Sequence, residues 1–156
     1  MKVLPDLKPA DYEMPQRNSF TLPQGIIGFG DYTHAEINYI PDHLPFLWLK
    51  LSGGKETDSV HFIVLEPAGF IPGYEPELFD EDASGLDLQD PSEVMLLNIV
   101  AMTSQQPVEA SVNLVGPIVV NRRTRVGRQL VVSNYQRYSA HHPLADVSQQ
   151  EARATA

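Results

Sequence analysis

Alternating apolar and polar side chains predict that much of this chain forms short β-strands. The clearest alternation covers Thr33–Ile40, where Ala35, Ile37 and Tyr39 fall on one face and polar residues on the other, the pattern of a half-buried strand. A shorter strand is expected at Phe20–Leu22, ahead of a Pro-Gln-Gly turn. Two further runs are apolar on both faces and indicate buried, central strands: Phe46–Leu51 and Val60–Leu65.

The second half of the chain adds a longer apolar run and a compact group of strand signals. Val94–Met102 contains several β-branched residues and has no polar face, which favours a buried strand over a helix. Pro117 has no amide hydrogen for a strand ladder and is therefore expected at a bulge or a strand end. Gly127 is expected to let the chain reverse after a basic turn. Three short strands in a meander are predicted here: Ser111–Val115, Ile118–Val120 and Gln129–Val132.

Prolines and glycines limit the predicted fold class. The 13 prolines and 10 glycines favour many short elements over long helices. One short helix is expected at Asp80–Ser84, ended by Gly85 in the left-handed conformation. Because there is no βαβ rhythm, the pattern predicts an all-β fold, either a small antiparallel β-barrel-like domain or two packed sheets, with one or two short helices. With 156 residues, we expect one domain over 1–144 and a flexible or helical tail over 145–156.

Composition limits the compartment and the kind of partner. The chain has no cysteine, no apolar run near the roughly 20 residues of a membrane helix, and no apolar signal core at its start. A cytoplasmic location without membrane contact is therefore expected. The formal charge of −9 disfavours general nucleic-acid binding and favours a basic protein partner. The simpler interpretation, that acidity only keeps the domain soluble, stays open.

Motifs for catalysis or cofactor binding lack the required spacing. The Gly54-Lys55 pair resembles part of a phosphate-binding loop. That loop needs glycine where this chain has Leu49, and serine or threonine where it has Glu56. The five histidines show no metal-ligand spacing, and His61, in a central strand, is expected to be a hydrogen-bonded core residue. We therefore expect no catalytic residue, no cofactor and no metal.

A dense acidic segment follows an aromatic, turn-rich stretch. Eight acids lie from Glu75 to Glu93, with no basic residue among them. The run lacks the opposed environments that catalytic carboxylate pairs need, so it is either a solvated face or a docking face for a basic partner. As a docking face, it has neighbouring aromatic and apolar side chains as anchors and acids at its rim. The residues predicted to bind a partner are Phe70, Ile71, Tyr74, Glu75, Glu77, Asp80, Glu81 and Asp82.

Arginines around the predicted basic turn form the opposite pole of the chain. Although an arginine cluster can bind RNA, no aromatic residue interleaves these four and the net charge opposes RNA binding. We expect them to pair with acids of this chain or of a partner. In the same stretch, Asn113, Pro117 and Asn121 are interpreted as fold determinants, with polar side chains that satisfy backbone groups. The four arginines are Arg122, Arg123, Arg125 and Arg128.

Five blocks spread over residues 20–144 carry a more specific pattern. They are LPQGIIGFGDY at 22–32, PFLWLKL at 45–51, FIVLEPAGFIPGYEPEL at 62–78, NLVGPIVVNRRTRVGRQ at 113–129 and YSAHHPL at 138–144. In this order they resemble the FliW family of bacterial flagellar assembly factors, and the fourth block is the most specific. The chain departs from the family pattern at Gly30 and Gly73, where an acid is usual, and at His141, where arginine is usual.

The resemblance implies a small β-barrel-like domain without catalytic activity and with two protein partners. One is flagellin. The other is CsrA, a small dimeric RNA-binding regulator that represses flagellin synthesis in many bacteria. In the family picture, FliW held by flagellin leaves CsrA free to repress, and export of flagellin releases FliW to bind CsrA away from its RNA surface. Such a switch needs the two complexes to compete, and the segment from Phe70 to Asp82 is expected to contribute to the CsrA surface.

Two other classes of function stay open from the residues alone. A small-molecule-binding or hydrolytic β-barrel has its site in the barrel mouth, as a concave apolar pocket with a few convergent polar groups. An RNA-binding barrel uses the arginine turn. The first class requires such a pocket in the structure, and the second requires a gel shift with a structured RNA.

Overall fold

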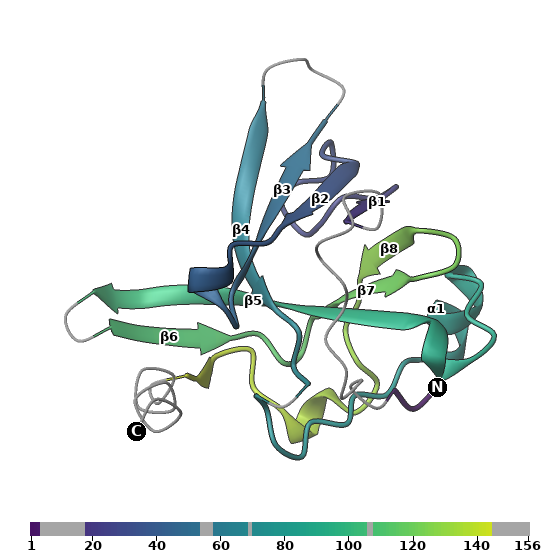
Figure 1. Ribbon diagram of the computed structural model, residues 1–156. Coiled ribbons are helices and arrows are strands. Elements are labelled where there is room, and N and C mark those ends of the chain that lie inside the picture. The colour runs from purple at the N-terminus through teal and green to yellow at the C-terminus, as the bar shows by residue number, and fades with distance from the viewer. Residues whose placement is uncertain (4–17, 54–57, 69, 106–107, 145–156) are drawn as a thin grey trace.

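The computed structural model shows a strand-rich fold with one short α-helix (Figure 1). The described part of the chain comprises residues 1–3, 18–53, 58–68, 70–105 and 108–144, without the side chains of 103–105 and 108. The tail predicted over 145–156 lies outside the described residues. The strands are β1 (Ser19–Thr21), β2 (His34–Asn38), β3 (Leu47–Ser52), β4 (Ser59–Leu65), β5 (Val94–Gln105), β6 (Val108–Val112), β7 (Ile118–Asn121), β8 (Val126–Gln129) and β9 (His142–Pro143).

Helical structure in the described residues is short, as the proline and glycine content predicts. The α-helix, α1 (Asp80–Gly85), lies where the sequence analysis expects it. Single 3₁₀ turns connect several of the strands, and one of them ends directly before β5. These turns are η2 (Pro41–His43), η3 (Pro91–Glu93) and η4 (Tyr135–Arg137).

The end of α1 differs from the prediction. The left-handed residue is Asp87, with a φ of 52°, and not Gly85. The amide of Leu88 donates to the carbonyl of Ala83 at 2.9 Å, and the amide of Asp87 donates to the carbonyl of Ser84 at 3.0 Å. This pair of bonds is the Schellman arrangement that ends many helices. Because it closes two residues beyond the glycine, the helical turn continues past Gly85.

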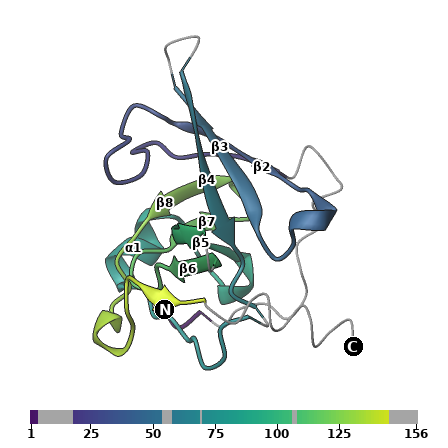
Figure 2. The ribbon, with the colours of Figure 1, turned by 90° about the vertical axis from the view of Figure 1, so that its left-hand side faces the viewer.

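Seven strands close into a barrel in the order β1-β2-β3-β4-β5-β7-β8 and back to β1 (Figures 1 and 2). Each neighbouring pair in this ring is antiparallel except β1 and β8, which run parallel. That seam is narrow. Thr21 pairs with Val126, and the Thr21 amide donates to the carbonyl of Arg125 at 2.9 Å. The predicted all-β, barrel-like fold is confirmed, and its closure depends on one parallel contact.

Strand β5 belongs to the barrel and also extends beyond it. Its first residues, Val94–Leu97, pair with β7, whereas Val100–Gln105 pair with β6, and β6 in turn pairs with β9. Figure 1 shows β5 crossing the molecule toward β6. The predicted meander is therefore wrong, because β6 and β7 each lie against a separate half of β5. Pro117 directly precedes β7, at a strand end as predicted.

The third strand of this region comes earlier than predicted. Strand β8 ends where the predicted run Gln129–Val132 begins. A Cβ atom on Gly127 would lie 2.9 Å from Val120 Cγ2 and 3.1 Å from the Val119 carbonyl oxygen. Glycine therefore allows β8 to lie close against β7, inside a strand rather than at a reversal. The reversal lies before β8 and includes Arg125, which has a φ of 59°.

Alternate residues of β5 and β7 serve two different cores. On the barrel's inner face, Leu97 and Ile118 pack with buried residues of β2 and β3. On the outer face, Leu96 and Val119 pack with residues of α1 and with buried Val3. Because successive side chains of a strand point to opposite faces, burial on both sides explains why Val94–Leu97 at the start of β5 are all apolar.

Burial in strands β2, β3 and β4 agrees with the prediction only in part. Ala35 and Ile37 of β2 are buried, as predicted for that face. On β3, full burial alternates with partial burial, so the second face is only half-buried. His61 on β4 is exposed, which corrects the expectation of a core histidine. The reason is that β4 pairs with β5 only from Ile63 onward, so His61 lies beyond that contact.

Candidate functional site

The first half of the acidic segment includes a short extended stretch, Glu75–Leu78, whose backbone is bonded along both edges. One edge faces the start of the chain. The amide of Val3 donates to the Pro76 carbonyl at 2.9 Å, and the amide of Leu78 donates to the Met1 carbonyl at 2.7 Å. The Met1 amine returns a 2.7 Å bond to the Leu78 carbonyl. We call Glu75–Leu78 the clamped segment.

The other edge of the clamped segment faces Ser133 and Asn134. The Ser133 amide donates to the Glu77 carbonyl at 2.7 Å. The Asn134 side chain accepts from the Glu77 amide at 3.0 Å and donates to the Glu75 carbonyl at 2.9 Å. One asparagine side chain therefore supplies the donor and acceptor that a neighbouring strand supplies in a sheet. The backbone that carries the two glutamates is fixed from both sides.

The side chains of the clamped segment alternate between core and surface. Pro76 and Leu78 are buried, whereas Glu75 and Glu77 point outward and are partly exposed. Lys2 lies 3.4 Å from the Glu75 carboxylate, with both side chains about half-exposed. Such an exposed ion pair contributes little to stability. The segment therefore displays acids on a rigid base without depending on them for its own structure.

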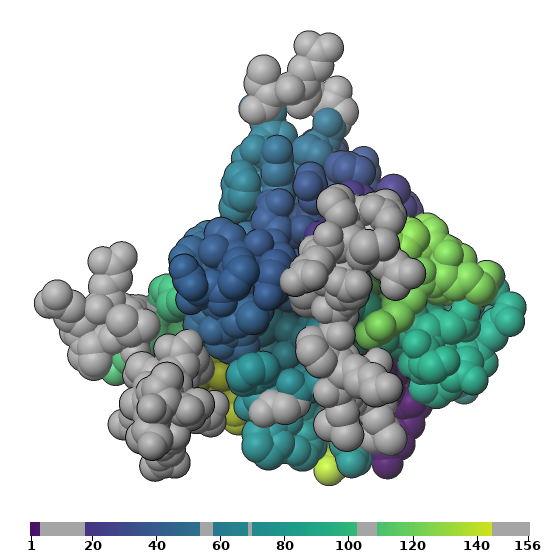
Figure 3. Space-filling model, in the orientation of Figure 1, coloured from purple at the N-terminus to yellow at the C-terminus, as the bar shows by residue number. Residues whose placement is uncertain are grey.

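The acids of α1 continue this surface. Asp80 is fully exposed and lies 3.7 Å from the Met1 amine, and Glu81 is exposed. Asp82 is more covered and lies 3.8 Å from Arg128 of β8. Figure 3 shows α1 and the β7–β8 turn next to one another on the surface, with the first residues of the chain below them. All five acids predicted to bind a partner thus retain some exposure to solvent.

The predicted aromatic and apolar anchors behave differently from one another. Phe70 is 40% exposed, but Ile71 and Tyr74 are buried in a cluster with Val100 and Leu114. Neither Ile71 nor Tyr74 can act as a surface anchor in this structure, which corrects that part of the prediction. Both side chains fill the space outside the barrel, because the loop after β4 folds back over β5 and the β6–β7 connection.

Tyr74 is a structural centre of this outer layer. Its hydroxyl donates to the Leu114 carbonyl at 2.7 Å and accepts from Asn98 at 3.3 Å. Its ring meets the Tyr138 ring edge-to-face, with centroids 4.9 Å apart. Burial raises the pKa of Tyr74 to about 12, because ionisation would place a charge in an apolar site. The Tyr138 hydroxyl in turn accepts from the Glu75 amide at 2.9 Å.

The sequence analysis does not identify two exposed aromatic residues that lie beside the clamped segment. Phe79 is 47% exposed, and Tyr135, next to Asn134, is 45% exposed. A signal for Phe79 is present in the sequence, since it continues the period-two, outward-facing pattern of Glu75 and Glu77. No comparable signal marks Tyr135, because only the fold brings it to this segment.

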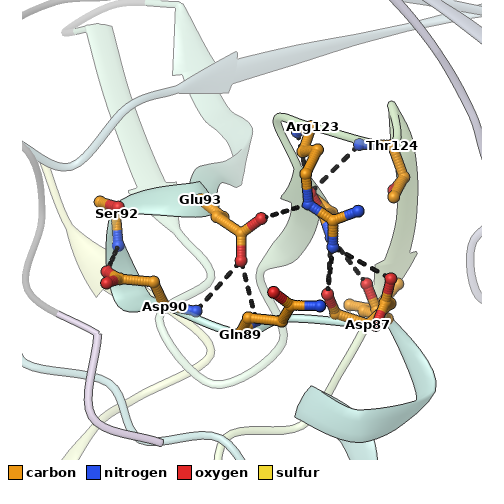
Figure 4. Close-up of polar contacts among 9 residues, drawn as sticks. Asp87, Gln89, Asp90, Ser92, Glu93, Arg123 and Thr124 are labelled. Carbon is orange, nitrogen blue, oxygen red and sulfur yellow. Dashed lines mark hydrogen bonds and ion pairs between the residues drawn. The ribbon is translucent and has the colours of Figure 1, made fainter.

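The second half of the acidic segment is organised around Arg123 (Figure 4). Its guanidinium lies 2.6 Å from the Glu93 carboxylate and 3.0 Å from the Asp87 carboxylate, and it also donates to the Asp87 carbonyl at 2.8 Å. Glu93 accepts from the amides of Gln89 and Asp90 at 2.8 and 3.0 Å. These carboxylates are therefore occupied within the chain.

The hydrogen bonds of this network shift three pKa values. The Arg123 side chain lowers the pKa of Glu93, and the Gln89 amide adds to the effect. The Ser92 amide, 2.8 Å from the Asp90 carboxylate, lowers the pKa of Asp90. Glu93 and Asp87 together raise the pKa of Arg123. Each shift favours the charged form that makes the bond.

The remaining arginines of the basic turn also have partners inside the chain. Arg122 donates through Nε to the Val94 carbonyl at 3.2 Å, and Arg125 donates through Nε to the Ser19 carbonyl at 3.1 Å. The prediction that the arginines pair with the chain's own acids is confirmed for Arg123 and, at a longer distance, for Arg128. All four arginines thus contact groups of the chain itself.

Two asparagines predicted to be fold determinants hold this region together. The Asn113 side chain accepts from the amides of Val115 and Gly116 at 3.0 and 2.9 Å. Asn121 is fully buried and donates to the carbonyls of Leu86 and Asp87 at 2.8 and 3.2 Å, while its oxygen accepts from amides of the basic turn. The prediction that both side chains satisfy backbone groups is confirmed.

The described residues contain no candidate metal site, because no group of three or more histidine or acidic side chains among them could hold a metal ion. None of the helices in this part is long and apolar enough to cross a membrane. The barrel interior is filled by buried side chains such as Phe20, Leu49 and Leu97, which argues against a ligand site deep in the barrel.

Fold and surface together define a class: small β-barrel proteins with an ordered acidic layer on the outside of the barrel. A family model described as FliW protein matches residues 7–144. This chain belongs to the FliW family.

Individual relatives agree with this assignment. A Clostridioides difficile protein named Flagellar assembly factor FliW is 36% identical over 124 residues, which cover 80% of this chain and 92% of the relative. A Natranaerobius thermophilus protein with the same name is 28% identical over 143 residues, 92% of each chain. The crystal structure of a flagellar assembly factor FliW superposes with a TM-score of 0.66 at 24% identity, covering 83% of this chain and 86% of the other. That structure supports the barrel fold.

Proposed function

We propose that this chain is a flagellar assembly factor that acts in the cytoplasm by binding CsrA and flagellin in turn, without catalysing a reaction. Membership of the family and the names of its relatives support the assembly role. Flagellin-bound protein leaves CsrA free to repress flagellin synthesis. Export of flagellin releases the protein, which then binds CsrA away from its RNA surface and relieves repression.

The observation that carries the CsrA half of this proposal is the clamped segment with its outward acids. An RNA-binding regulator needs positive charge to hold phosphates, and the chain carries a formal charge of −9. Complementary charges raise the encounter rate and select the partner. Because both edges of Glu75–Leu78 are bonded, the acidic surface is ordered before the partner arrives, which lowers the entropy cost of binding.

A charge-reversal experiment tests this assignment. The variant Asp80→Lys/Glu81→Lys changes two exposed acids whose side chains make none of the hydrogen bonds of the clamped segment, and it removes the 3.7 Å ion pair between Asp80 and the Met1 amine. We expect its affinity for CsrA, measured by calorimetry at low salt, to fall about tenfold or more. The matched control is Asp31→Lys/Asp58→Lys, which makes the same change in net charge at two exposed acids near the barrel strands. Equal losses in both variants would indicate a net-charge effect and contradict a CsrA surface at Asp80.

The exchange of partners needs a separate experiment. We expect added flagellin to displace CsrA from the protein in a fluorescence competition assay, with a midpoint that rises with the CsrA concentration. A stable ternary complex, seen as one larger species in analytical ultracentrifugation, would contradict a switch based on competition.

A further inference from the structure

The 3₁₀ turn η2 (Pro41–His43), between β2 and β3, is held to the barrel by few contacts. None of its residues is buried, and its first residue is not capped by a side chain. Figure 2 shows η2 as a dark blue turn that projects to one side. Its backbone bonds are local: the His43 amide donates to the Ile40 carbonyl, and the Phe46 amide donates to the His43 carbonyl, each at 2.9 Å. These bonds shape the turn without attaching it to the sheet.

A single side-chain hydrogen bond attaches η2 to the outer face of the barrel. Trp48 of β3 donates through Nε1 to Nδ1 of His43 at 3.0 Å, and the two rings lie with centroids 6.0 Å apart and planes tilted by 56°. Within the described part of the chain, η2 makes no other side-chain hydrogen bond or ion pair. Trp48 itself is fixed in the sheet, opposite Asn38 of β2 and Ile63 of β4.

The bond between these two rings exists only while His43 is neutral. An indole N–H can only donate, and Nδ1 of histidine can accept only when it carries no proton. Protonation therefore places two donors opposite one another and removes the bond. Histidine ordinarily changes its charge between about pH 8 and about pH 5. We propose that the His43–Trp48 bond is a pH-sensitive tie, which holds η2 on the barrel when His43 is neutral and releases it when His43 is protonated.

The charged groups around this pair carry both signs. Asp42 of η2 adjoins His43, whereas the row of Trp48 on the sheet is uncharged, since it consists of Asn38, Trp48 and Ile63. The next row lies roughly 6.5 Å along the strands. The ionisable side chains of this outer face are Glu36 and His34 of β2, Lys50 of β3 and His61 of β4. His61 can titrate in the same range as His43, so a test must separate the two.

Release of η2 affects two apolar side chains that flank it. Ile40 is 39% exposed and Leu44 is 42% exposed, and both belong to the stretch that the His43–Trp48 bond holds in place. The arrangement in which they face solvent therefore depends on the protonation of one histidine. This inference goes beyond the proposed function and does not depend on either protein partner.

The test is a pH titration of the full chain by NMR. Because Trp48 is the one tryptophan of the chain, its indole N–H gives a single, unambiguous signal. We expect this signal to shift in one step between about pH 8 and about pH 5. The heteronuclear NOE of the backbone amides of Asp42, His43 and Leu44 is expected to fall through the same step, because these residues gain freedom when the tie opens. No step in the indole signal, or an unchanged NOE, overturns the proposal.

Variants identify the group that titrates. His43→Phe keeps an aromatic ring beside Trp48 but has no acceptor, so we expect no step and a low NOE for η2 at both ends of the titration. His43→Gln cannot titrate and is likewise expected to show no step, whether or not its amide accepts from the indole. The matched control is His61→Gln, at an exposed histidine of the same face, which should keep the step at the same pH. A step that persists in His43→Gln, or vanishes in His61→Gln, contradicts the assignment to His43.

Discussion

The acidic segment consists of two halves that look alike in sequence and differ in structure. In the first half, Glu75–Asp82, the backbone is held by main-chain groups of Met1–Val3, including the charged Met1 amine, and by the Asn134 side chain, and the carboxylates face outward. In the second half, Asp87–Glu93, the carboxylates themselves do the holding, through Arg123 and backbone amides. Charge density alone therefore does not identify a binding surface. What matters is whether the fold uses the charges or only displays them.

The difference assigns separate roles to the two halves. Removing a carboxylate from the second half should disturb local structure, because its hydrogen bonds cap η3 and link it to the β7–β8 turn. Removing one from the first half should disturb binding first. Three changes test this contrast, from the largest expected effect on the chain to the smallest.

Asn121→Ala should produce the largest effect. This buried side chain connects the end of α1 to the basic turn through bonds to Leu86, Asp87 and two turn amides, and its loss leaves those groups without partners. We expect the free energy of unfolding to fall by about 3 kcal/mol, measured by urea denaturation. Thr124→Ala changes an exposed residue of the same turn and should stay close to the unmodified chain. A small effect of Asn121→Ala would mean that the second half is held mainly by its ion pairs.

Tyr74→Phe should have an intermediate effect that depends on pH. Loss of the hydroxyl leaves the Leu114 carbonyl without its donor, which should cost about 1–2 kcal/mol near neutral pH. The folded pKa of Tyr74 is raised from 10.0 to about 12, so the stabilisation is fully present below pH 10.0 and is lost as pH rises through about 12.

Denaturation at several pH values measures this linkage. The unmodified chain should lose stability between pH 10 and about pH 12 more steeply than Tyr74→Phe, since the variant lacks the group that must ionise. Tyr135→Phe, at an exposed tyrosine, serves as the matched control and should keep the steep loss. Parallel pH curves for Tyr74→Phe and the unmodified chain would contradict burial of this hydroxyl.

Arg123→Gln should have the smallest effect on stability, because the pairs it makes are at the surface. The sharper measurement is a carboxyl titration by NMR. The pKa of Glu93 should rise toward its usual value, since Arg123 is the main cause of its depression. Asp90 provides an internal control, because its lowered pKa comes from Ser92 and should not move. The stability that Glu93 contributes is present above its unfolded pKa and lost on acidification through the folded pKa, so the variant should show a weaker loss at acid pH.

The sequence patterns predict the barrel better than they predict its connections. Alternation places β2 correctly, and the apolar run of β5 is confirmed as a strand. The register of the later strands is not predictable in the same way. In the sequence, Gly127 suggests a reversal of the chain. In the structure it lies within a strand, where Val120 is too close to leave room for a side chain. Nothing local indicates that β5 is long enough to separate β6 from β7.

The candidate site likewise has some features that the local sequence predicts and others that depend on long-range contacts. The outward direction of Glu75 and Glu77 follows from their spacing, which is a local property. Burial of Tyr74 depends on Leu114 and Tyr138, residues far along the chain, so its aromatic character alone suggests an anchor where the fold builds a core. The exposure of Tyr135 beside Glu75 is equally a product of long-range contacts.

The clamped segment has a consequence for synthesis of the protein. It is supported by residues 1–3 on one edge and by residues 133–134 on the other. When a ribosome has translated the chain only through β8, the last strand of the barrel, residues 133–134 have not yet been made. A chain truncated before residue 133 therefore keeps support along one edge of the clamped segment alone.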